Sequence, residues 1–209
     1  MNDNEVSIID YGLGNLRSVV RAFDKLKIKS KIINSPKEIN EATHLVLPGV
    51  GAFEDGMKGL NERNLVNDIK TYVKEKKPLL GICLGMQLLM TKSEEFGLHK
   101  GLNLINGKVI YLKSAKERGY KVPHVGWAPL LVKKSWNKTI LSSIKEESEV
   151  YFVHSFYVKK DNKNTIAFTK YGEEEICAVI QKNNIIGCQF HPEMSDKIGL
   201  EIYKNFSKL

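Results

Sequence analysis

Cys83 is the residue best suited to act as a nucleophile. It lies in Gly81-Ile82-Cys83-Leu84-Gly85, after a run typical of a buried strand and before a run typical of a helix. This context matches a nucleophile elbow with cysteine in place of serine. Flanking glycines relieve crowding in the sharp turn, a helix N-terminus favours the thiolate, and the Leu84 N–H points where an oxyanion would form. A small buried cysteine without a catalytic role is the alternative.

A histidine and a carboxylate supply the other groups that a cysteine nucleophile needs. Gln189-Phe190-His191-Pro192-Glu193 ends the last predicted strand, and in extended geometry His191 and Glu193 project the same way. An imidazole would take the thiol proton, and a carboxylate would fix its tautomer and steady its positive charge. Taken singly, His191 fits a turn histidine and Glu193 a solvated acid. Their combination with Cys83 favours the catalytic interpretation.

A glycine-rich loop, Pro48-Gly49-Val50-Gly51-Ala52-Phe53, follows the third predicted strand. Its functional interpretation is a second backbone donor for the oxyanion, facing Cys83. The alternative is an ordinary strand-to-helix turn. No Gly-Lys-Ser/Thr follows, so the loop is not a Walker loop and a phosphate site is not expected there.

The elements that must position these residues alternate between strand and helix in the first half of the chain. Apolar runs predict strands at residues 6–9, 31–33, 44–47 and 78–82, the last apolar on both faces as a central parallel strand should be. Helical patterns cover 16–26, 65–73 and 84–90, and Ser35-Pro36 indicates a further helix start. Cys83 therefore falls at the carboxyl end of a central strand, where α/β folds place their sites.

The second half is mostly strand-like, at residues 109–111, 130–132, 150–158, 165–171, 176–180 and 185–190. A final amphipathic helix carries Ile198, Ile202, Phe206 and Leu209. The chain shows no linker, internal repeat or low-complexity segment. We therefore expect residues 1–209 to form one α/β domain, with a mostly parallel central sheet flanked by helices and an antiparallel extension in the second half.

The composition excludes several classes of protein. With 42% hydrophobic and 27% charged residues, disorder, collagen and coiled coil do not describe the whole chain. No apolar run approaches the roughly 20 residues that span a bilayer, and the N-terminus lacks a signal pattern, so we expect a cytoplasmic protein that does not associate with membranes. Three cysteines without a Cys-x-x-Cys pair argue against disulfides or zinc. The lysines behind the net charge of +8 are scattered, which favours a Lys-rich surface over nucleic-acid binding.

Three segments resemble the class I, or triad, glutamine amidotransferases in order and spacing: Pro48-Gly49-Val50-Gly51, Gly81-Ile82-Cys83-Leu84-Gly85-Met86-Gln87 and Phe190-His191-Pro192-Glu193. Within that family, the chain is most similar, over essentially its whole length, to the glutaminase subunits of imidazole glycerol phosphate synthases. The segments that carry this closer resemblance are Ile9 to Leu16, Pro123 to Trp127 and Tyr151 to Phe156. The resemblance implies a flavodoxin-like sheet of the class I amidotransferase type.

The reaction that the resemblance implies is hydrolysis of glutamine to glutamate and ammonia. Cys83 would attack the side-chain amide carbon to give a thioester, which water would then cleave. His191 would act first as base and then as acid, with Glu193 orienting it. Leu84 and Val50 would supply the backbone N–H pair of the oxyanion hole.

The resemblance also implies a binding site for substrate glutamine. Glu95 can pair with its α-ammonium, and Gln87, one turn into the elbow helix, can reach it. Ser155 and Phe156 can offer main-chain groups at a strand edge. Without the family, Glu95 would be interpreted as one more exposed acid. The residues implied to hold glutamine are Gly51, Gln87, Glu95, Ser155 and Phe156.

No cofactor or metal is implied, but a partner is. Such glutaminases pass ammonia through a protein channel to a cyclase subunit, a (β/α)8 barrel, and together they make imidazole glycerol phosphate and an aminoimidazole carboxamide ribotide in histidine biosynthesis. The interface is expected at Asn15, His124, Trp127 and Tyr151, since Trp and Tyr are typical anchors. Partial core burial is the alternative for Trp127. Because glycines let the peptides around Val50 reorient, we expect low activity in the free chain and activation by cyclase and its ligand.

One position departs from the family pattern. A basic residue usually follows His-Pro-Glu, but Met194 stands there, which puts one interface contact in doubt. Met194 also fits a paralogous glutaminase that supplies ammonia for surface-sugar amidination. Two further alternatives are another Cys–His–Glu hydrolase, such as a γ-glutamyl peptidase, and a catalytically dead binding module. Gln87 and Glu95 argue against the first, and the intact triad argues against the second.

Overall fold

The computed structural model describes residues 5–159 and 163–209. Residues 1–4 belong to the N-terminal segment, in which we expected no targeting signal, and they lie outside the described residues. In the first half, strands and helices alternate in the order β1 (Val6–Ile9), α1 (Leu16–Lys25), β2 (Ser30–Ile33), α2 (Pro36–Glu41), β3 (His44–Leu47), α3 (Phe53–Glu62), α4 (Val66–Lys74), β4 (Leu79–Ile82) and α5 (Leu84–Leu88).

The second half is richer in strands. It contains β5 (Met90–Ser93), β6 (His99–Lys100), β7 (Ile105–Tyr111), α6 (Lys113–Glu117), β8 (His124–Pro129), β9 (Leu131–Val132), β10 (Glu149–His154), β11 (Phe156–Val158), β12 (Thr165–Tyr171), β13 (Glu174–Lys182), β14 (Ile185–Cys188), a 3₁₀ turn (Pro192–Met194) and α7 (Asp196–Phe206). Across the described ranges, no helix is long and apolar enough to cross a membrane.

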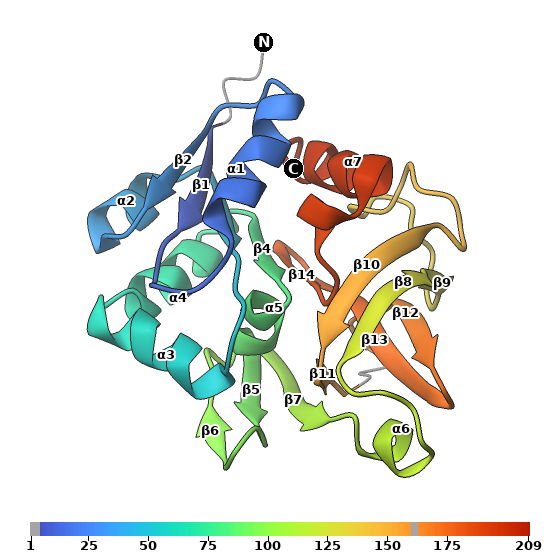
Figure 1. Cartoon of the computed structure of the whole chain (residues 1–209). Coiled ribbons are helices and arrows are strands. Elements are labelled where there is room, and N and C mark those ends of the chain that lie inside the picture. Colours follow the sequence, from blue (N-terminus) through green and yellow to red (C-terminus); the bar gives the residue numbers. More distant parts are fainter. Residues whose placement is uncertain (1–4, 160–162) are drawn as a thin grey trace.

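The central sheet has the strand order β2-β1-β3-β4-β14-β13-β12-β9 (Figure 1). Its first five strands run parallel, and β13, β12 and β9 extend it in antiparallel fashion. This confirms the expected mixed sheet. The carboxyl ends of β3, β4 and β14 meet at one edge, which brings the glycine-rich loop, Cys83 and the segment that contains His191 together.

Helices cover both faces of the parallel part of the sheet. Alternate residues of a strand face opposite sides, so Ile8 and Ile9 belong to two different cores. On one face, Phe23 of α1 and Tyr203 of α7 pack against Ile8, with ring centroids of the two aromatics 4.7 Å apart. On the other face, α2 to α5 pack against residues such as Ile9 and Leu47. Burial on both faces explains the continuous apolar runs of these strands.

Two helices of the first half differ from the sequence prediction. The helix after Cys83 ends at Leu88 instead of Met90, because Met90 begins β5 and pairs with β7. Helix α3 was not predicted, since Gly56 and Gly59 weaken its pattern. The structure supplies the reason for both glycines: a side chain on Gly56 would crowd Leu88, and one on Gly59 would collide with the backbone oxygen of Tyr11.

The strands of the second half divide among three sheets instead of only extending one. The single strand predicted over residues 150–158 is interrupted at Ser155. Its first part, β10, pairs with β8 in a separate two-stranded ribbon, and its second part, β11, joins β7, β5 and β6. The predicted strand 185–190 ends at Cys188, and Leu209 lies beyond α7. A local sequence pattern cannot predict which strands pair, because each pairing depends on a strand that is distant in the sequence.

Candidate active site

Cys83 lies in the turn between β4 and α5 with a strained backbone. Its φ is 52° and its ψ is −108°, a conformation that non-glycine residues seldom adopt and that clusters at functional sites. The turn is fixed by the Cys83 N–H, which donates to the Cys188 carbonyl at 2.7 Å. Only 7% of the residue is exposed. The fold therefore holds the sulfur at the sheet edge, as a nucleophile elbow does.

The glycines on either side of Cys83 are required by packing. A Cβ on Gly85 would collide with the Leu47 carbonyl of β3, and one on Gly81 would come within 2.8 Å of the Gly85 backbone. The predicted steric role of these glycines is confirmed. Helix α5, which follows the turn, is only five residues long.

His191 and Glu193 form a buried pair. Nδ1 of His191 lies 2.7 Å from Oε1 of Glu193, and each side chain is 4% exposed. The predicted contact is present, but the predicted geometry is wrong. β14 ends at Cys188, and Glu193 lies on the 3₁₀ turn, which brings its carboxylate back onto the ring. Nε2 of His191 is buried and has no hydrogen-bond partner among the described residues, so it is free for proton transfer.

Two residues that the sequence did not indicate hold this pair in place. The Tyr203 hydroxyl of α7 donates to Oε2 of Glu193 at 3.3 Å. The Ser195 hydroxyl donates to the His191 carbonyl at 2.7 Å and accepts from the Tyr151 N–H at 3.0 Å. Tyr203 lies on the buried face of α7, where a tyrosine is not distinguishable by pattern from any other core residue.

The charges around His191 favour its protonated form. Burial by itself would lower the pKa of His191, but the nearby Cys83 sulfur and Glu193 carboxylate outweigh burial and raise that pKa to about 10. An imidazolium is therefore the favoured state at neutral pH. This changes the expected starting state, in which neutral His191 was the base that activates Cys83.

Cys83 opens into a cavity of about 250 Å³. A cavity of this size suits a ligand smaller than typical drug-sized ones. The residues expected to form the oxyanion hole and to hold glutamine all line it together with Cys83 and His191: Val50, Gly51, Leu84, Gln87, Glu95, Ser155 and Phe156.

Gln87 connects the cavity wall to the nucleophile through a buried network. Its Nε2 donates to the Phe156 carbonyl at 2.9 Å and lies 3.3 Å from Oε1 of Gln189, whose own Nε2 donates to the Cys83 sulfur at 3.8 Å. The Phe156 carbonyl also accepts from Nδ1 of His154 at 3.0 Å, so this oxygen is already doubly engaged. Gln189 was quoted in the sequence motif without a role, because nothing local shows that it turns inward.

Glu95 is a buried acid and not an exposed one, which rules out the alternative considered from sequence. It is 9% exposed, and one oxygen accepts from the Phe53 N–H at the start of α3 at 2.7 Å. Burial raises the pKa of Glu95, although the Phe53 N–H works in the opposite direction. A cationic group in the cavity would therefore stabilise the charged form of Glu95 and lower its pKa again.

The two backbone donors expected at the oxyanion are not both directed at the cavity. The Leu84 N–H donates to the Gly49 carbonyl at 3.3 Å. In a trans peptide the C=O and the following N–H point in opposite directions, so the Val50 N–H points away from Leu84. Rotation of the Gly49–Val50 peptide would release the Leu84 N–H and turn the Val50 N–H inward.

The expected interface residues are distributed unevenly over surface and core. Trp127 is 47% exposed, which is compatible both with an interface role and with the alternative of partial core burial, and its ring meets that of Tyr151 at a 6.0 Å centroid distance. The exposed Asn15 caps α1 by accepting from the Ser18 N–H at 3.4 Å. His124 requires a correction. It is 4% exposed and its Nδ1 lies 3.2 Å from Nε2 of His154, so its imidazole belongs to the interior and not to the surface.

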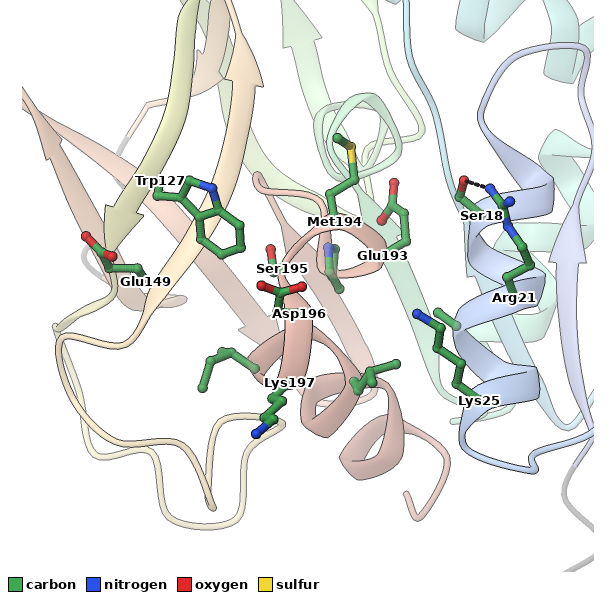
Figure 2. Close-up of a pocket in the computed structure, with 14 residues that line it drawn as sticks. Ser18, Arg21, Lys25, Trp127, Glu149, Glu193, Met194, Ser195, Asp196 and Lys197 are labelled. Carbon is green, nitrogen blue, oxygen red and sulfur yellow. Dashed lines mark hydrogen bonds between the residues drawn. The ribbon is translucent and has the colours of Figure 1, made fainter.

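A larger groove of about 1110 Å³ lies beside Glu193 (Figure 2). Met194 and Trp127 face α1 across it, and Arg21 and Lys25 project from α1. Met194 is 46% exposed. The groove is lined by basic, acidic and apolar side chains, whereas Cys83 and His191 line the smaller cavity, so the smaller cavity is the candidate site of the chemistry. Within the described residues, no cluster of three or more His, Cys, Asp or Glu side chains is arranged to hold a metal ion.

Comparisons with known proteins identify a family and relatives that match nearly the whole chain. The family model for class-I glutamine amidotransferases matches residues 7–208. The imidazole glycerol phosphate synthase subunit HisH 1 of Legionella pneumophila (strain Lens) is 48% identical over 212 residues, covering 99% of this chain and 100% of that protein. The HisH subunit of Geobacter metallireducens is 46% identical over 205 residues, covering 97% of each.

Solved structures share the fold. A crystal structure described as a glutamine amidotransferase gives a TM-score of 0.74 at 16% identity, covering 98% of this chain and 99% of its own. PurLQS from Thermotoga maritima gives 0.75 at 17% identity, covering 97% and 96%. The family model and the full-length relatives together decide the family: the chain belongs to the class-I glutamine amidotransferases.

Proposed function

We propose that this chain is the glutaminase subunit of an imidazole glycerol phosphate synthase and releases ammonia from glutamine for histidine biosynthesis. The observation that carries the proposal is the site: Cys83 on a strained turn, beside the buried His191–Glu193 pair, in a cavity lined by Gln87 and Glu95. The full-length HisH relatives support the choice of pathway. We also propose that residues 1–209 work as one domain.

In the first half of the reaction, the Cys83 sulfur attacks the side-chain amide carbon of glutamine. The carbonyl becomes an oxyanion, and the Nε2 proton of the His191 imidazolium passes to the departing nitrogen. The C–N bond breaks, ammonia leaves, and a glutamyl thioester remains on Cys83. Glu193 stabilises the imidazolium and fixes the ring through Nδ1, as its 2.7 Å contact supports.

In the second half, neutral His191 takes a proton from water while the water oxygen attacks the thioester carbon. The C–S bond then breaks, glutamate leaves, and the thiolate and imidazolium are restored. The raised pKa of His191 supports the imidazolium of this resting state. The free Nε2 is the only ring nitrogen available for both transfers, since Glu193 occupies Nδ1.

We assign glutamine recognition to the wall of the small cavity. Glu95 pairs with the α-ammonium, which offsets the effect of burial on its carboxylate. Gln87 contributes at the elbow side, and Gly51 and Ser155 offer main-chain groups. Phe156 offers van der Waals contact to the substrate instead of a hydrogen bond, since its carbonyl already accepts two hydrogen bonds. A set of groups suited to a free amino acid favours a glutaminase over a γ-glutamyl peptidase.

The oxyanion hole is completed by a rotation of the Gly49–Val50 peptide. Before this rotation, the Leu84 N–H donates to the Gly49 carbonyl and is not available to an oxyanion. After rotation, Leu84 and Val50 donate together to the oxyanion. Losing one oxyanion donor costs roughly 10²–10³ in rate, which sets the scale of activation when a partner drives the rotation.

The partner is the cyclase subunit, a (β/α)8 barrel that receives the ammonia through a channel. Trp127, Tyr151 and Asn15 form the docking surface, with the groove of Figure 2 next to them. Trp127 presents an exposed aromatic across the groove from basic side chains such as Arg21, and Trp and Arg are both typical interface anchors.

Met194 favours a second candidate, a paralogous glutaminase that supplies ammonia for surface-sugar amidination. Its thioether, and not a basic group, is exposed in the groove next to Glu193. The two candidates share the glutaminase chemistry and differ in the ammonia acceptor. Product formation with the cyclase, but not with an amidination synthase, selects the first.

The test uses Cys83→Ala with the cognate cyclase. Glutamine-dependent product formation should fall by about 10⁴-fold or more, while ammonia-dependent formation survives because added ammonia bypasses the thiol. Cys188→Ala is the matched control, since that buried thiol lies at the end of β14 and does not line the cavity. Residual glutamine turnover within tenfold of wild type would remove Cys83 from the mechanism. A catalytically dead binding module would show no glutamine turnover in the wild type.

A further inference from the structure

Tyr11 is a buried tyrosine whose hydroxyl finds no partner in the described part of the chain. It is 1% exposed, and its Oη forms no hydrogen bond with any described residue. Buried tyrosine hydroxyls ordinarily find a partner, and other buried tyrosines here do. Tyr72 donates toward the carbonyls of Thr43 and Pro78 at 3.0 and 2.9 Å. The unpartnered donor of Tyr11 therefore needs a reason.

The Tyr11 hydroxyl lies against the peptide that controls the oxyanion hole. A Cβ on Gly49 would collide with Oη of Tyr11, and Oη is the heavy atom closest to that position. Gly49 is also the residue whose carbonyl accepts the Leu84 N–H. Burial, and then the charge of Cys83, raise the pKa of Tyr11. Its hydroxyl therefore keeps its proton and remains a donor within electrostatic reach of the nucleophile.

We propose that Tyr11 is a positioning residue whose hydroxyl donates to the Gly49 carbonyl when the Gly49–Val50 peptide rotates. Rotation removes that carbonyl from the Leu84 N–H, and a buried carbonyl needs another donor. Tyr11 supplies it at the hinge. The proposal rests on the proposed glutaminase function and identifies what stabilises its active backbone orientation.

The arrangement acts on an equilibrium between two backbone orientations. In the orientation described here the hydroxyl is buried without a partner, which disfavours this state. In the rotated orientation the same hydroxyl is satisfied. Phenylalanine at position 11 would remove both effects, so the rotated population should fall by roughly the contribution of one hydrogen bond, about three- to tenfold.

The experiment compares Tyr11→Phe with Tyr72→Phe, a matched removal of one buried hydroxyl. Tyr11→Phe should lower kcat for glutamine roughly three- to tenfold in the free chain, and by no more than that with cyclase, where the partner also drives rotation. KM should stay within about twofold, and the melting temperature should not fall. Tyr72→Phe should lower the melting temperature, because it breaks hydrogen bonds, and leave kcat unchanged.

Alkylation of Cys83 by iodoacetamide separates this role from a direct effect on the sulfur. Alkylation forms no oxyanion, so its rate in Tyr11→Phe should match wild type. An altered alkylation rate, or an unchanged kcat in an active enzyme, would overturn the role of Tyr11 and leave the glutaminase function standing. A wild-type chain inactive on glutamine both alone and with cyclase would overturn the function and this role together.

Discussion

Glu193→Gln should move the alkaline limit of glutamine hydrolysis to lower pH. The mechanism needs the His191 imidazolium, and the pKa of His191 is held at about 10 by Cys83 and Glu193 against the effect of burial. Glu193 lies 2.7 Å from the ring, and both side chains are 4% exposed. An opposite charge at such range raises a cationic pKa by about 1 to 3 pH units. Removing the charge of Glu193 should therefore bring the alkaline limb of the pH–rate profile to about pH 7–9.

The assay is steady-state ammonia release measured as a function of pH for wild type and variant in complex with cyclase. Glu201→Gln is the control, because Glu201 is a partly exposed acid of α7 that pairs with Lys204. Peak turnover should fall less than in Cys83→Ala, since the base is retained. An alkaline limb that stays in place would show that Glu193 does not set the protonation of His191 and would refute the reasoning.

The same pair should make stability depend on pH with a defined sign. The pKa of His191 in the folded protein, about 10, lies above its ordinary value of 6.5. The resulting stabilisation is complete below about pH 6.5 and is lost as pH rises through about 10. The difference in melting temperature between wild type and Glu193→Gln should therefore be largest below pH 6.5 and shrink toward pH 10. A difference that grows with pH would contradict this linkage.

Other predictions concern packing, recognition and docking. Gly85→Ala should destabilise the fold by more than about 3 kcal/mol in urea unfolding, since its Cβ meets a β3 carbonyl; Gly107→Ala, which meets only a methionine sulfur, should be mild. Glu95→Gln should raise KM for glutamine about tenfold or more with a smaller effect on kcat, unlike Glu94→Gln at an exposed ion pair. Trp127→Ala should weaken cyclase binding roughly tenfold or more in titration calorimetry without lowering the melting temperature of the free chain.

The parts of the site that depend on local sequence were predictable. Gly81 and Gly85 indicate the turn at Cys83, because only glycine fits where the neighbouring backbone comes so close. The parallel strands were also predictable, since burial on both faces leaves an uninterrupted apolar run. The sequence indicates the same chemistry for Cys83, His191 and Glu193 because a nucleophile, a base and a carboxylate recur in fixed roles.

The parts that depend on distant contacts were not predictable. Whether Glu95 is exposed or buried is decided by α3, whose glycines weaken its own signal. His124 follows a strand-like alternation, but its inward face is set by stacking on Phe152 and Tyr171, with centroids 5.1 and 4.1 Å away. The hydrogen bond from Tyr203 to the triad carboxylate likewise joins residues through the fold and not through a motif.

Trapping the covalent intermediate tests the central claim most directly. The protein, in complex with cyclase and its ligand, would be mixed with glutamine, quenched in acid within the turnover time, and examined by intact-mass and peptide mass spectrometry. The mechanism predicts a glutamyl adduct on the peptide that carries Cys83, absent in Cys83→Ala and unchanged in Cys188→Ala. Glutamine turnover without such an adduct, or with an adduct on another residue, would contradict the account.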